Sequence, residues 1–216
     1  MMDAVLLSGG LDSTVLLAER AANGGVLAIT IDYGQRHRKE VTAAGEIALL
    51  FGAEHVVVKL THFGSLLKGS SQTDRKVPVP EGHYAAANMK TTVVPNRNMV
   101  MLAVAASIAE TKAIDRLYFA AHGGDHAIYP DCRPAFVEAL RGALLLASWR
   151  PVGLVAPFLG MTKGEIVRRG AALSVPFART WSCYKGLVHH CGRCGTCVER
   201  REAFAVAGVP DPTTYL

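Results

Sequence analysis

The sequence lacks any long hydrophobic run. Its longest apolar stretch, Met99 to Ala109, is far shorter than the roughly 18 residues that a membrane-spanning helix needs. The acidic Asp3 and the short apolar run Ala4 to Leu7 do not match a secretory signal, which has a basic start and a longer apolar segment. We therefore expect a protein that has no contact with a membrane and works in the cytoplasm.

Charge is also scarce, because only 19% of the 216 residues are charged whereas 50% are hydrophobic. A mean hydropathy of +0.22 excludes a disordered chain, which combines low hydrophobicity with high net charge. The net charge of +5 is dispersed apart from short clusters such as Arg36 to Lys39. This pattern indicates a solvated surface, and we expect no direct nucleic-acid partner.

Strands and helices are predicted to alternate along most of the chain. Apolar runs and turn residues predict strands at 4–7, 26–31, 55–60 and 117–121, and helices near 15–22, 40–51, 98–112, 135–146, 162–173 and 198–206. Such alternation is typical of a doubly wound α/β fold with a parallel sheet. Residues 69–95, rich in Gly, Ser, Pro and charge, are predicted to form a long loop that folds over a site or moves.

A glycine turn, Ser8 to Ser13, lies between the first predicted strand and helix. Glycine lets backbone amides approach a bulky anion, and the helix N-terminus adds partial positive charge. The hydroxyls of Ser8 and Ser13 are suited to phosphate oxygens, and Asp12 is suited to Mg²⁺. Neither the P-loop pattern nor G-x-G-x-x-G is present. The turn therefore predicts a different phosphate cradle, although a plain strand-to-helix turn would explain the two glycines alone.

Four of the five cysteines are clustered near the C-terminus: Cys183, Cys191, Cys194 and Cys197. Two-residue gaps let thiolates converge on one ion, and disulfides are rare in the cytoplasm. Four thiolates close a coordination shell, so we expect one structural Zn²⁺ per chain. An iron–sulfur cluster is the alternative, and His189 or His190 is a possible replacement for one thiolate.

Polar residues follow a predicted strand around Cys132. Ligands bind outside the carboxyl ends of strands in open α/β sheets, and Asp131 and Arg133 lie just beyond such an end. A lone cysteine is typically a small buried hydrophobic side chain. We therefore prefer Asp131 and Arg133 to Cys132 as binding residues.

The run from Ser8 to Ser13 resembles the pyrophosphate loop of the N-type ATP pyrophosphatases, which cleave ATP between its α and β phosphates. Further segments narrow the resemblance, over nearly the whole chain, to the 7-cyano-7-deazaguanine synthase family of that group. These segments are 32–37, 94–98, 129–133, 180–183 with the cysteine cluster, and 211–213. The segment from His122 to His126 departs from the pattern of the family.

The resemblance implies an ATP-dependent ligase of queuosine biosynthesis. It would convert 7-carboxy-7-deazaguanine and ammonia into 7-cyano-7-deazaguanine (preQ0) through an adenylated acid and an adenylated amide. Adenylation is needed because a carboxylate and an amide both lack a good leaving group. The resemblance also implies Mg²⁺ with ATP and a homodimer. The sequence has no segment similar to a glutaminase, so we expect free ammonia as the nitrogen source.

Site residues follow from the resemblance by position. ATP binding is expected at Leu7, Ser8, Gly9, Gly10, Leu11, Asp12, Ser13, Ile31 and Asp32. The expected catalytic residues are Asp12, Arg97, Asp131 and Lys163, and the expected substrate-binding residues are Tyr129, Asp131 and Arg133. Lys163 would stabilise charge that develops at the α-phosphate. Arg97 would bind a phosphate or the substrate carboxylate through two hydrogen bonds.

We expect residues 1–175 to form the adenylating domain and residues 176–216 to form the zinc-binding region. Two alternatives remain open. A tRNA-thiolating enzyme of the same fold would need a sulfur-carrying cysteine or an RNA-binding extension. A zinc-ribbon regulator that binds nucleic acid would leave the run from Ser8 to Ser13 unexplained.

Overall fold

A computed structural model describes residues 2–85 and 87–216 and contains a five-stranded parallel sheet. The strand order is β3-β2-β1-β4-β5, formed by β1 (Asp3–Leu6), β2 (Val26–Asp32), β3 (Glu54–Lys59), β4 (Arg116–Tyr118) and β5 (Gly153–Val155). Neighbouring parallel strands need long crossover connections, which here are mostly helical. The predicted doubly wound α/β fold is confirmed.

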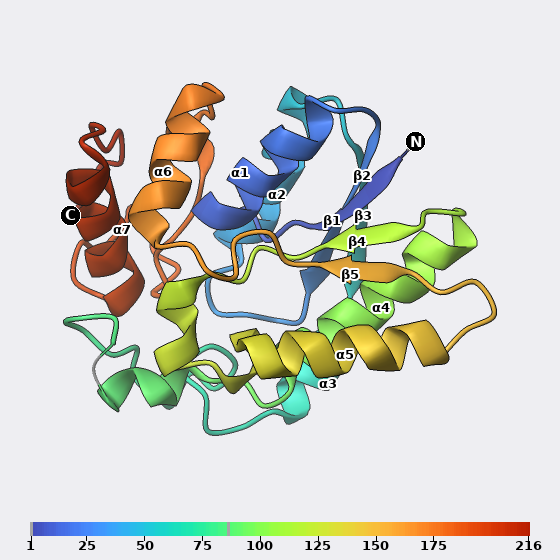
Figure 1. Cartoon of the computed structure of the whole chain (residues 1–216). Helices are drawn as coiled ribbons and strands as arrows, with labels where there is room; N and C mark the ends of the chain where they lie inside the picture. The colour runs from blue at the N-terminus through green and yellow to red at the C-terminus, as the bar shows by residue number, and fades with distance from the viewer. Residues whose placement is uncertain (1, 86) are drawn as a thin grey trace.

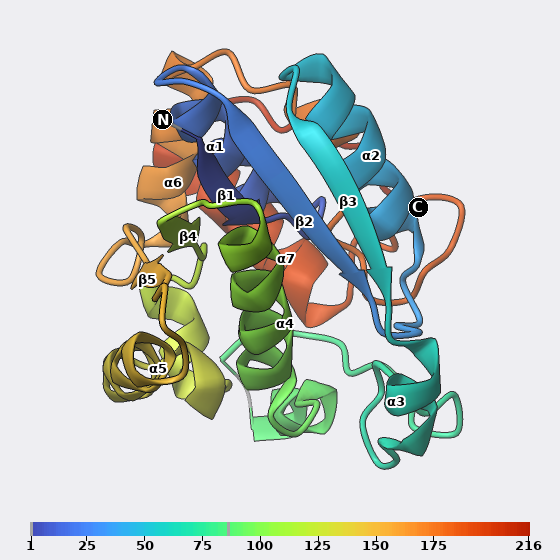
Figure 2. The same cartoon turned by 90° about the vertical axis from the view of Figure 1, so that its right-hand side faces the viewer.

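Helices cover both faces of this sheet (Figures 1 and 2). One face carries α1 (Leu11–Ala21), α2 (Lys39–Leu50), α6 (Lys163–Ala172) and α7 (Gly195–Ala207). The other face carries α4 (Arg97–Thr111) and α5 (Pro134–Leu146), and the short α3 (Thr61–Leu66) follows β3. The molecule is therefore built in three layers.

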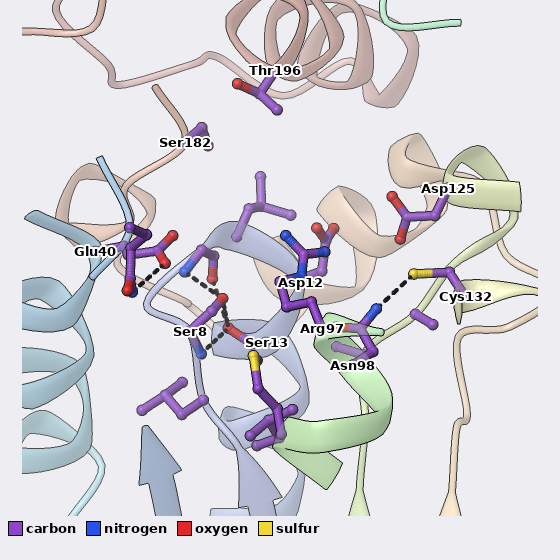
Figure 3. Close-up of a pocket in the computed structure, with 18 of the residues that line it drawn as sticks. Ser8, Asp12, Ser13, Glu40, Arg97, Asn98, Asp125, Cys132, Ser182 and Thr196 are labelled. Atoms are coloured by element: carbon purple, nitrogen blue, oxygen red, sulfur yellow. Dashed lines mark hydrogen bonds between the residues drawn. The ribbon is translucent and has the colours of Figure 1, made fainter. Parts of the chain in front are cut away.

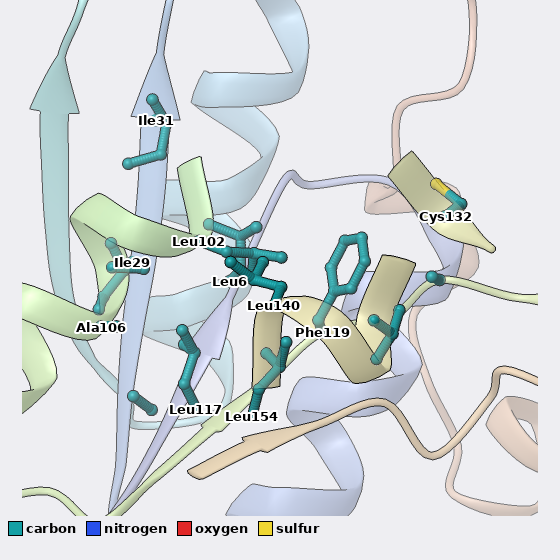
Figure 4. Packing of buried hydrophobic residues seen from close by; sticks show 14 of the residues in the cluster. Leu6, Ile29, Ile31, Leu102, Ala106, Leu117, Phe119, Cys132, Leu140 and Leu154 are labelled. Atoms are coloured by element: carbon teal, nitrogen blue, oxygen red, sulfur yellow. The ribbon is translucent and has the colours of Figure 1, made fainter. Parts of the chain in front are cut away.

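The core lies on both sides of the sheet because successive strand residues point to opposite faces. Ala4 and Leu6 of β1 pack in the cluster that includes α4 and α5, whereas Val5 packs in the cluster that includes α1, α2 and α6. Figure 4 shows Leu6 in the first cluster, with Leu102 of α4 and Leu140 of α5. Burial of both faces explains why the central strands β1 and β2 are largely apolar, whereas the edge strand β3 is polar at both ends.

The strand order reverses at β1 and β4, which are neighbours at the centre of the sheet. The helix after β1 and the long helix after β4 cover opposite faces. Connections that diverge in this way leave a crevice outside the carboxyl ends of the strands. The Ser8 to Gly10 turn, which follows β1, lies at this crevice.

The predicted strands and helices agree with the structure within a few residues, except that the first helix begins earlier, at Leu11. Two short elements were not predicted, α3 and β5, the second of which lies between Pro151 and Pro157. A capping box begins α6, because Thr162 accepts from the Glu165 amide at 3.3 Å and Glu165 accepts from the Thr162 amide at 2.7 Å.

Residues 69–95, predicted to form a long loop, contain a short helix and buried side chains. They include a 3₁₀ helix, Ala87–Thr92, and bury Tyr84 and Met89. Residue 86 in this segment lies outside the described residues. The expectation that the segment folds over a site agrees with Tyr84, which reaches the pocket described below.

The C-terminal region packs on the sheet domain. Ala203 and Phe204 of α7 belong to the same hydrophobic cluster as residues of α1 and α6. The division between residues 175 and 176 stays a prediction. No helix of the described residues is both long enough and apolar enough to cross a membrane.

Candidate active site

The glycine turn packs tightly against the start of α2. Gly9 has a positive φ of 84°, and a Cβ built on it would lie 2.1 Å from the carbonyl oxygen of Glu40. Only glycine fits this conformation and this contact. The turn is therefore fixed to α2, and Gly10 becomes the N-cap of α1.

Hydrogen bonds orient the two serines of the turn (Figure 3). The Ser8 and Ser13 hydroxyl oxygens are 3.0 Å apart, and the Ser8 amide donates to Ser13 Oγ at 3.2 Å. The Gly10 amide in turn donates to Ser8 Oγ at 3.1 Å. These contacts gather hydroxyl and amide donors at the N-terminus of α1, which is an arrangement suited to a phosphate.

An open pocket lies at this turn. Its lining includes Leu7, Ser8, Gly10, Leu11, Asp12, Ser13, Ile31, Tyr33, Tyr84, Arg97, Asn98, Asp125, Tyr129, Cys132, Lys163, Trp181, Ser182 and Tyr184. Most of the residues expected to bind ATP are therefore brought together, along with Arg97, Lys163 and Tyr129. Gly9 supports the turn from behind, and the Asp32 carboxylate instead pairs with Arg38 at 2.9 Å.

Lys163 lies between two carboxylates, of which Asp12 lines the pocket and Glu199 lies behind it. Its Nζ is 2.7 Å from Glu199 Oε2 and 3.1 Å from Asp12 Oδ2. Burial would lower the pKa of Lys163, but Asp12 and Glu199 raise it above its usual value. Burial would likewise raise the pKa of Asp12, but Lys163 and His122 bring it below its usual value. Lys163 and Asp12 therefore both carry charge at neutral pH.

His122 lies at the centre of the same cluster and is only 1% exposed. The Gly124 amide donates to its Nδ1 at 3.1 Å, which leaves Nε2 as the ring nitrogen that faces the carboxylates. This Nε2 lies 3.6 to 3.9 Å from carboxylate oxygens of Asp12, Asp125 and Glu199. We call Asp12, His122, Asp125, Lys163 and Glu199 the charged cluster.

Arg97 lies on the opposite side of the pocket among tyrosines. It lies beside Tyr33, and its guanidinium carbon is 5.4 Å from the centre of the Tyr129 ring. Burial raises the pKa of Tyr33 to about 12, although Arg97 beside it acts in the opposite direction. No carboxylate of residues 2–85 and 87–216 lies within 4.0 Å of the Arg97 guanidinium nitrogens. This cation is therefore open to an anionic ligand.

The tyrosines around Arg97 are linked to one another. The Tyr129 hydroxyl is 2.7 Å from Thr92 Oγ1 and 3.1 Å from the Tyr184 hydroxyl. Burial raises the pKa of Tyr184 far above its usual value, so its hydroxyl stays protonated. We call Tyr33, Arg97, Tyr129 and Tyr184 the aromatic wall. It offers neutral hydrogen-bonding groups around one cation.

Asp131 and Arg133 do not line the pocket among the described residues. Asp131 Oδ2 accepts from the Asn98 amide at 2.9 Å, at the start of α4. Arg133 is exposed and donates to the carbonyl oxygen of His126 at 2.9 Å. Their roles in substrate binding stay predictions without a supporting contact. Cys132 instead lines the pocket, and its Sγ accepts from Asn98 Nδ2 at 3.2 Å (Figure 3).

Several residues in the pocket or in contact with its lining were not predicted from the sequence. Glu199 follows the last cysteine by two positions, and nothing in the local sequence indicates that it meets Lys163. His122 and Asp125 were noticed only as a departure from the family pattern. Tyr184, which follows Cys183, gave no signal because nothing local shows that it meets Arg97.

The four clustered cysteines are arranged so that they could hold a metal ion. Their sulfur atoms all lie within 4.8 Å of one another and are buried. A tetrahedron with metal–sulfur bonds of about 2.3 Å has edges of about 3.8 Å, close to the 4.0 Å between Cys191 Sγ and Cys197 Sγ. The amides of Cys191 and Cys194 donate to Cys183 Sγ and Cys191 Sγ at 3.4 and 3.2 Å. The donor set therefore fits a metal that prefers sulfur ligands.

Comparison with known proteins identifies relatives of this fold and sequence. The 7-cyano-7-deazaguanine synthase of Allorhizobium ampelinum is 51% identical over 214 residues, which cover 98% of this chain and 91% of that protein. An NMN synthetase from Francisella tularensis has a similar structure, with a TM-score of 0.52 and 12% identity over 96% of this chain and 77% of that one.

The U34-tRNA thiolase NcsA from Methanococcus maripaludis, solved with its 4Fe–4S cluster, has a TM-score of 0.50 and 15% identity. The match covers 95% of this chain and 65% of that one. At such low identities these two structures show the shared fold alone. The sequence model of the family described as queuosine biosynthesis protein QueC matches residues 3–208. The chain therefore belongs to the QueC family.

Proposed function

We propose that this chain is an ATP-dependent ligase that converts 7-carboxy-7-deazaguanine and ammonia into 7-cyano-7-deazaguanine. One observation carries the proposal: a turn suited to phosphate and a half-buried arginine, which has no carboxylate partner among the described residues, line the same pocket. An adenylating enzyme needs both, because ATP and an organic acid must meet there. The relative from Allorhizobium ampelinum, whose name describes this activity, is 51% identical.

The glycine turn and the charged cluster form the ATP side of the proposed site. The amides and hydroxyls of Ser8, Gly10 and Ser13 would hold the departing pyrophosphate. Asp12 Oδ1 is buried without a hydrogen-bond partner, which fits a carboxylate that binds Mg²⁺. When bound with ATP, Mg²⁺ neutralises phosphate charge. Lys163 would then stabilise charge that develops on the α-phosphate.

The aromatic wall forms the acid side of the proposed site. Arg97 would bind the carboxylate of 7-carboxy-7-deazaguanine and hold it for attack on the α-phosphate, with release of pyrophosphate. Ammonia then displaces AMP from the acyl adenylate and forms the amide. A second ATP adenylates the amide oxygen, and loss of AMP and a proton gives the nitrile. The neutral tyrosine hydroxyls contribute hydrogen bonds without repelling the acid.

The four-cysteine site would hold one structural Zn²⁺. Four sulfur ligands leave no open position, which is typical of structural rather than catalytic zinc. An iron–sulfur cluster is the alternative, and metal analysis of purified protein decides between them. We further propose that the enzyme works as a homodimer in the cytoplasm with free ammonia as its nitrogen source.

The test is a complete reaction with purified protein, ATP, MgCl₂, ammonium chloride and 7-carboxy-7-deazaguanine. We expect mass spectrometry to detect the nitrile, together with AMP and pyrophosphate. Omission of ammonium should leave acid-dependent exchange of labelled pyrophosphate into ATP and no nitrile. Absence of both nitrile and exchange in protein that retains its metal would contradict the proposal.

A further inference from the structure

Helix α7 connects the four-cysteine site to the charged cluster. Cys194 is the N-cap of α7 and Cys197 lies in its first turn. Further along the helix, Glu199 and Arg200 are both buried. Glu199 contacts Lys163, and Arg200 contacts Thr180. A helix that begins within the four-cysteine site thus places Glu199 beside Lys163 of the charged cluster.

Glu199 makes the shorter of the two contacts of Lys163. Its Oε2 lies 2.7 Å from Lys163 Nζ, whereas Asp12 Oδ2 lies 3.1 Å away. Asp12 is also the carboxylate of the turn that is suited to Mg²⁺. Without Glu199, Lys163 would pair with Asp12 alone, and the lysine and the metal ion would compete for one carboxylate.

Arg200 fixes the position of the same helix. Its side chain is fully buried and donates to Thr180 Oγ1 at 2.7 Å and to the Phe177 carbonyl oxygen at 3.0 Å. The neighbouring Trp181 amide donates to the Gly9 carbonyl oxygen at 2.9 Å. These contacts link α7 to the glycine turn through residues 180 and 181. They therefore hold the helix in the position from which Glu199 reaches Lys163.

We propose that Glu199 is a positioning residue of the adenylation step, which holds Lys163 at the glycine turn and so leaves Asp12 Oδ1 available to bind Mg²⁺. This inference rests on the proposed function. Glu199 acts through Lys163 and contacts neither ATP nor the acid. A charged hydrogen bond of this kind typically contributes about 1.5 to 3 kcal/mol, which corresponds to about a 10- to 100-fold effect.

The principal test compares Glu199→Gln with Glu202→Gln. Glu202 is on the same helix, its side chain is 51% exposed, and its ion pair is with His83 at 3.7 Å. We expect Glu199→Gln to lower kcat/KM for ATP in pyrophosphate exchange by about 10- to 100-fold and to raise the Mg²⁺ concentration that gives half-maximal rate. Glu202→Gln should match the unmodified protein.

Two further measurements separate positioning from a general loss of structure. The content of the metal held by the cysteines should be unchanged in Glu199→Gln. Binding of Mn²⁺ in the presence of pyrophosphate, followed by electron paramagnetic resonance, should weaken, because Lys163 competes for Asp12. Addition of Glu199→Gln to a Lys163→Met variant should change exchange little further, since contacting residues are not additive.

Glu199→Asp is the second variant, because it keeps the charge but shortens the side chain, and we expect an intermediate loss. Equal rates for Glu199→Gln and Glu202→Gln would overturn the inference. So would full additivity with Lys163→Met, or loss of the metal or of folding in both Glu199 variants. Absence of exchange and nitrile in the unmodified protein would instead overturn the proposed function.

Discussion

The charged cluster and the aromatic wall each surround a partly buried cation, but with opposite kinds of neighbour. In the charged cluster, Lys163 is already paired with Asp12 and Glu199. In the aromatic wall, Arg97 is surrounded by neutral hydroxyls and aromatic rings. Removing a cation from water without an anionic partner is costly, so the half-buried Arg97 is suited to a ligand that supplies the anion. The charged cluster therefore holds a cation whose charge is already balanced by carboxylates, whereas the aromatic wall holds a cation that is suited to an anionic ligand.

Loss of the cysteine site should have the largest effect, because it supports both sides. Tyr184 follows Cys183, and Glu199 follows Cys197 by two positions. Structural zinc sites contribute about 10 to 16 kcal/mol, which exceeds the stability of many whole domains, about 5 to 15 kcal/mol. We expect Cys194→Ser to give insoluble or metal-free protein, as judged by solubility and metal analysis. Soluble protein with its metal and full activity would contradict this expectation.

Asp12→Ala should break the charged cluster alone. The change removes the carboxylate expected to bind Mg²⁺ and leaves Lys163 with Glu199. We expect acid-dependent release of pyrophosphate to be abolished while the metal held by the cysteines is retained, as measured on the same sample. Unaltered turnover would remove Asp12 from the mechanism.

Arg97→Lys should weaken the aromatic wall while keeping its charge. Lysine lacks the planar fork that binds a carboxylate through two hydrogen bonds. We expect the KM for 7-carboxy-7-deazaguanine to rise by about 10- to 100-fold, the equivalent of one charged hydrogen bond, with a smaller change in the KM for ATP. Arg179→Lys is the control, because that side chain is 60% exposed and paired with Glu46. A larger rise in the KM for ATP would instead assign Arg97 to a phosphate.

The smallest effect is expected from His55, which supports the glycine turn from β3. Its Nε2 is 2.9 Å from Thr30 Oγ1, which donates to the Leu7 carbonyl oxygen at 2.7 Å. Burial lowers the pKa of His55 below its usual 6.5, so the unfolded chain binds the proton more readily. This contribution is present above pH 6.5 and is lost as the pH falls. Thermal unfolding at pH 7.5 and pH 5.5 should depend less on pH in His55→Gln; an equal dependence would exclude this role.

The sequence predicts the local parts of the site and not the distant pairings. The turn from Ser8 to Ser13 and the four cysteines are contiguous patterns whose chemistry follows from spacing. Arg97, Tyr33 and Tyr184 come from three distant segments, and their meeting depends on the order in which strands pair and on the path of the 69–95 segment. No periodicity in the sequence carries that information.

Asp131 illustrates the same limit within a few residues. Its position after a strand favours a ligand contact, yet the short 3₁₀ turn Pro130–Cys132 directs its carboxylate to the amide that begins α4. Cys132, the next residue, faces the pocket instead. Position along the chain places a residue near a site, but a single turn decides which side chain enters it.

The two adjacent glycines of the turn are under different steric constraints. At Gly9 any side chain would enter the backbone of α2, so the position is closed to the other nineteen amino acids. At Gly10, which has an ordinary φ of −77°, a Cβ would approach Ser8 Oγ at 3.2 Å and otherwise face the pocket. Tolerance to substitution should therefore differ sharply between these adjacent positions. Gly9 is needed for the backbone conformation of the turn, whereas Gly10 keeps open the part of the pocket suited to an anion.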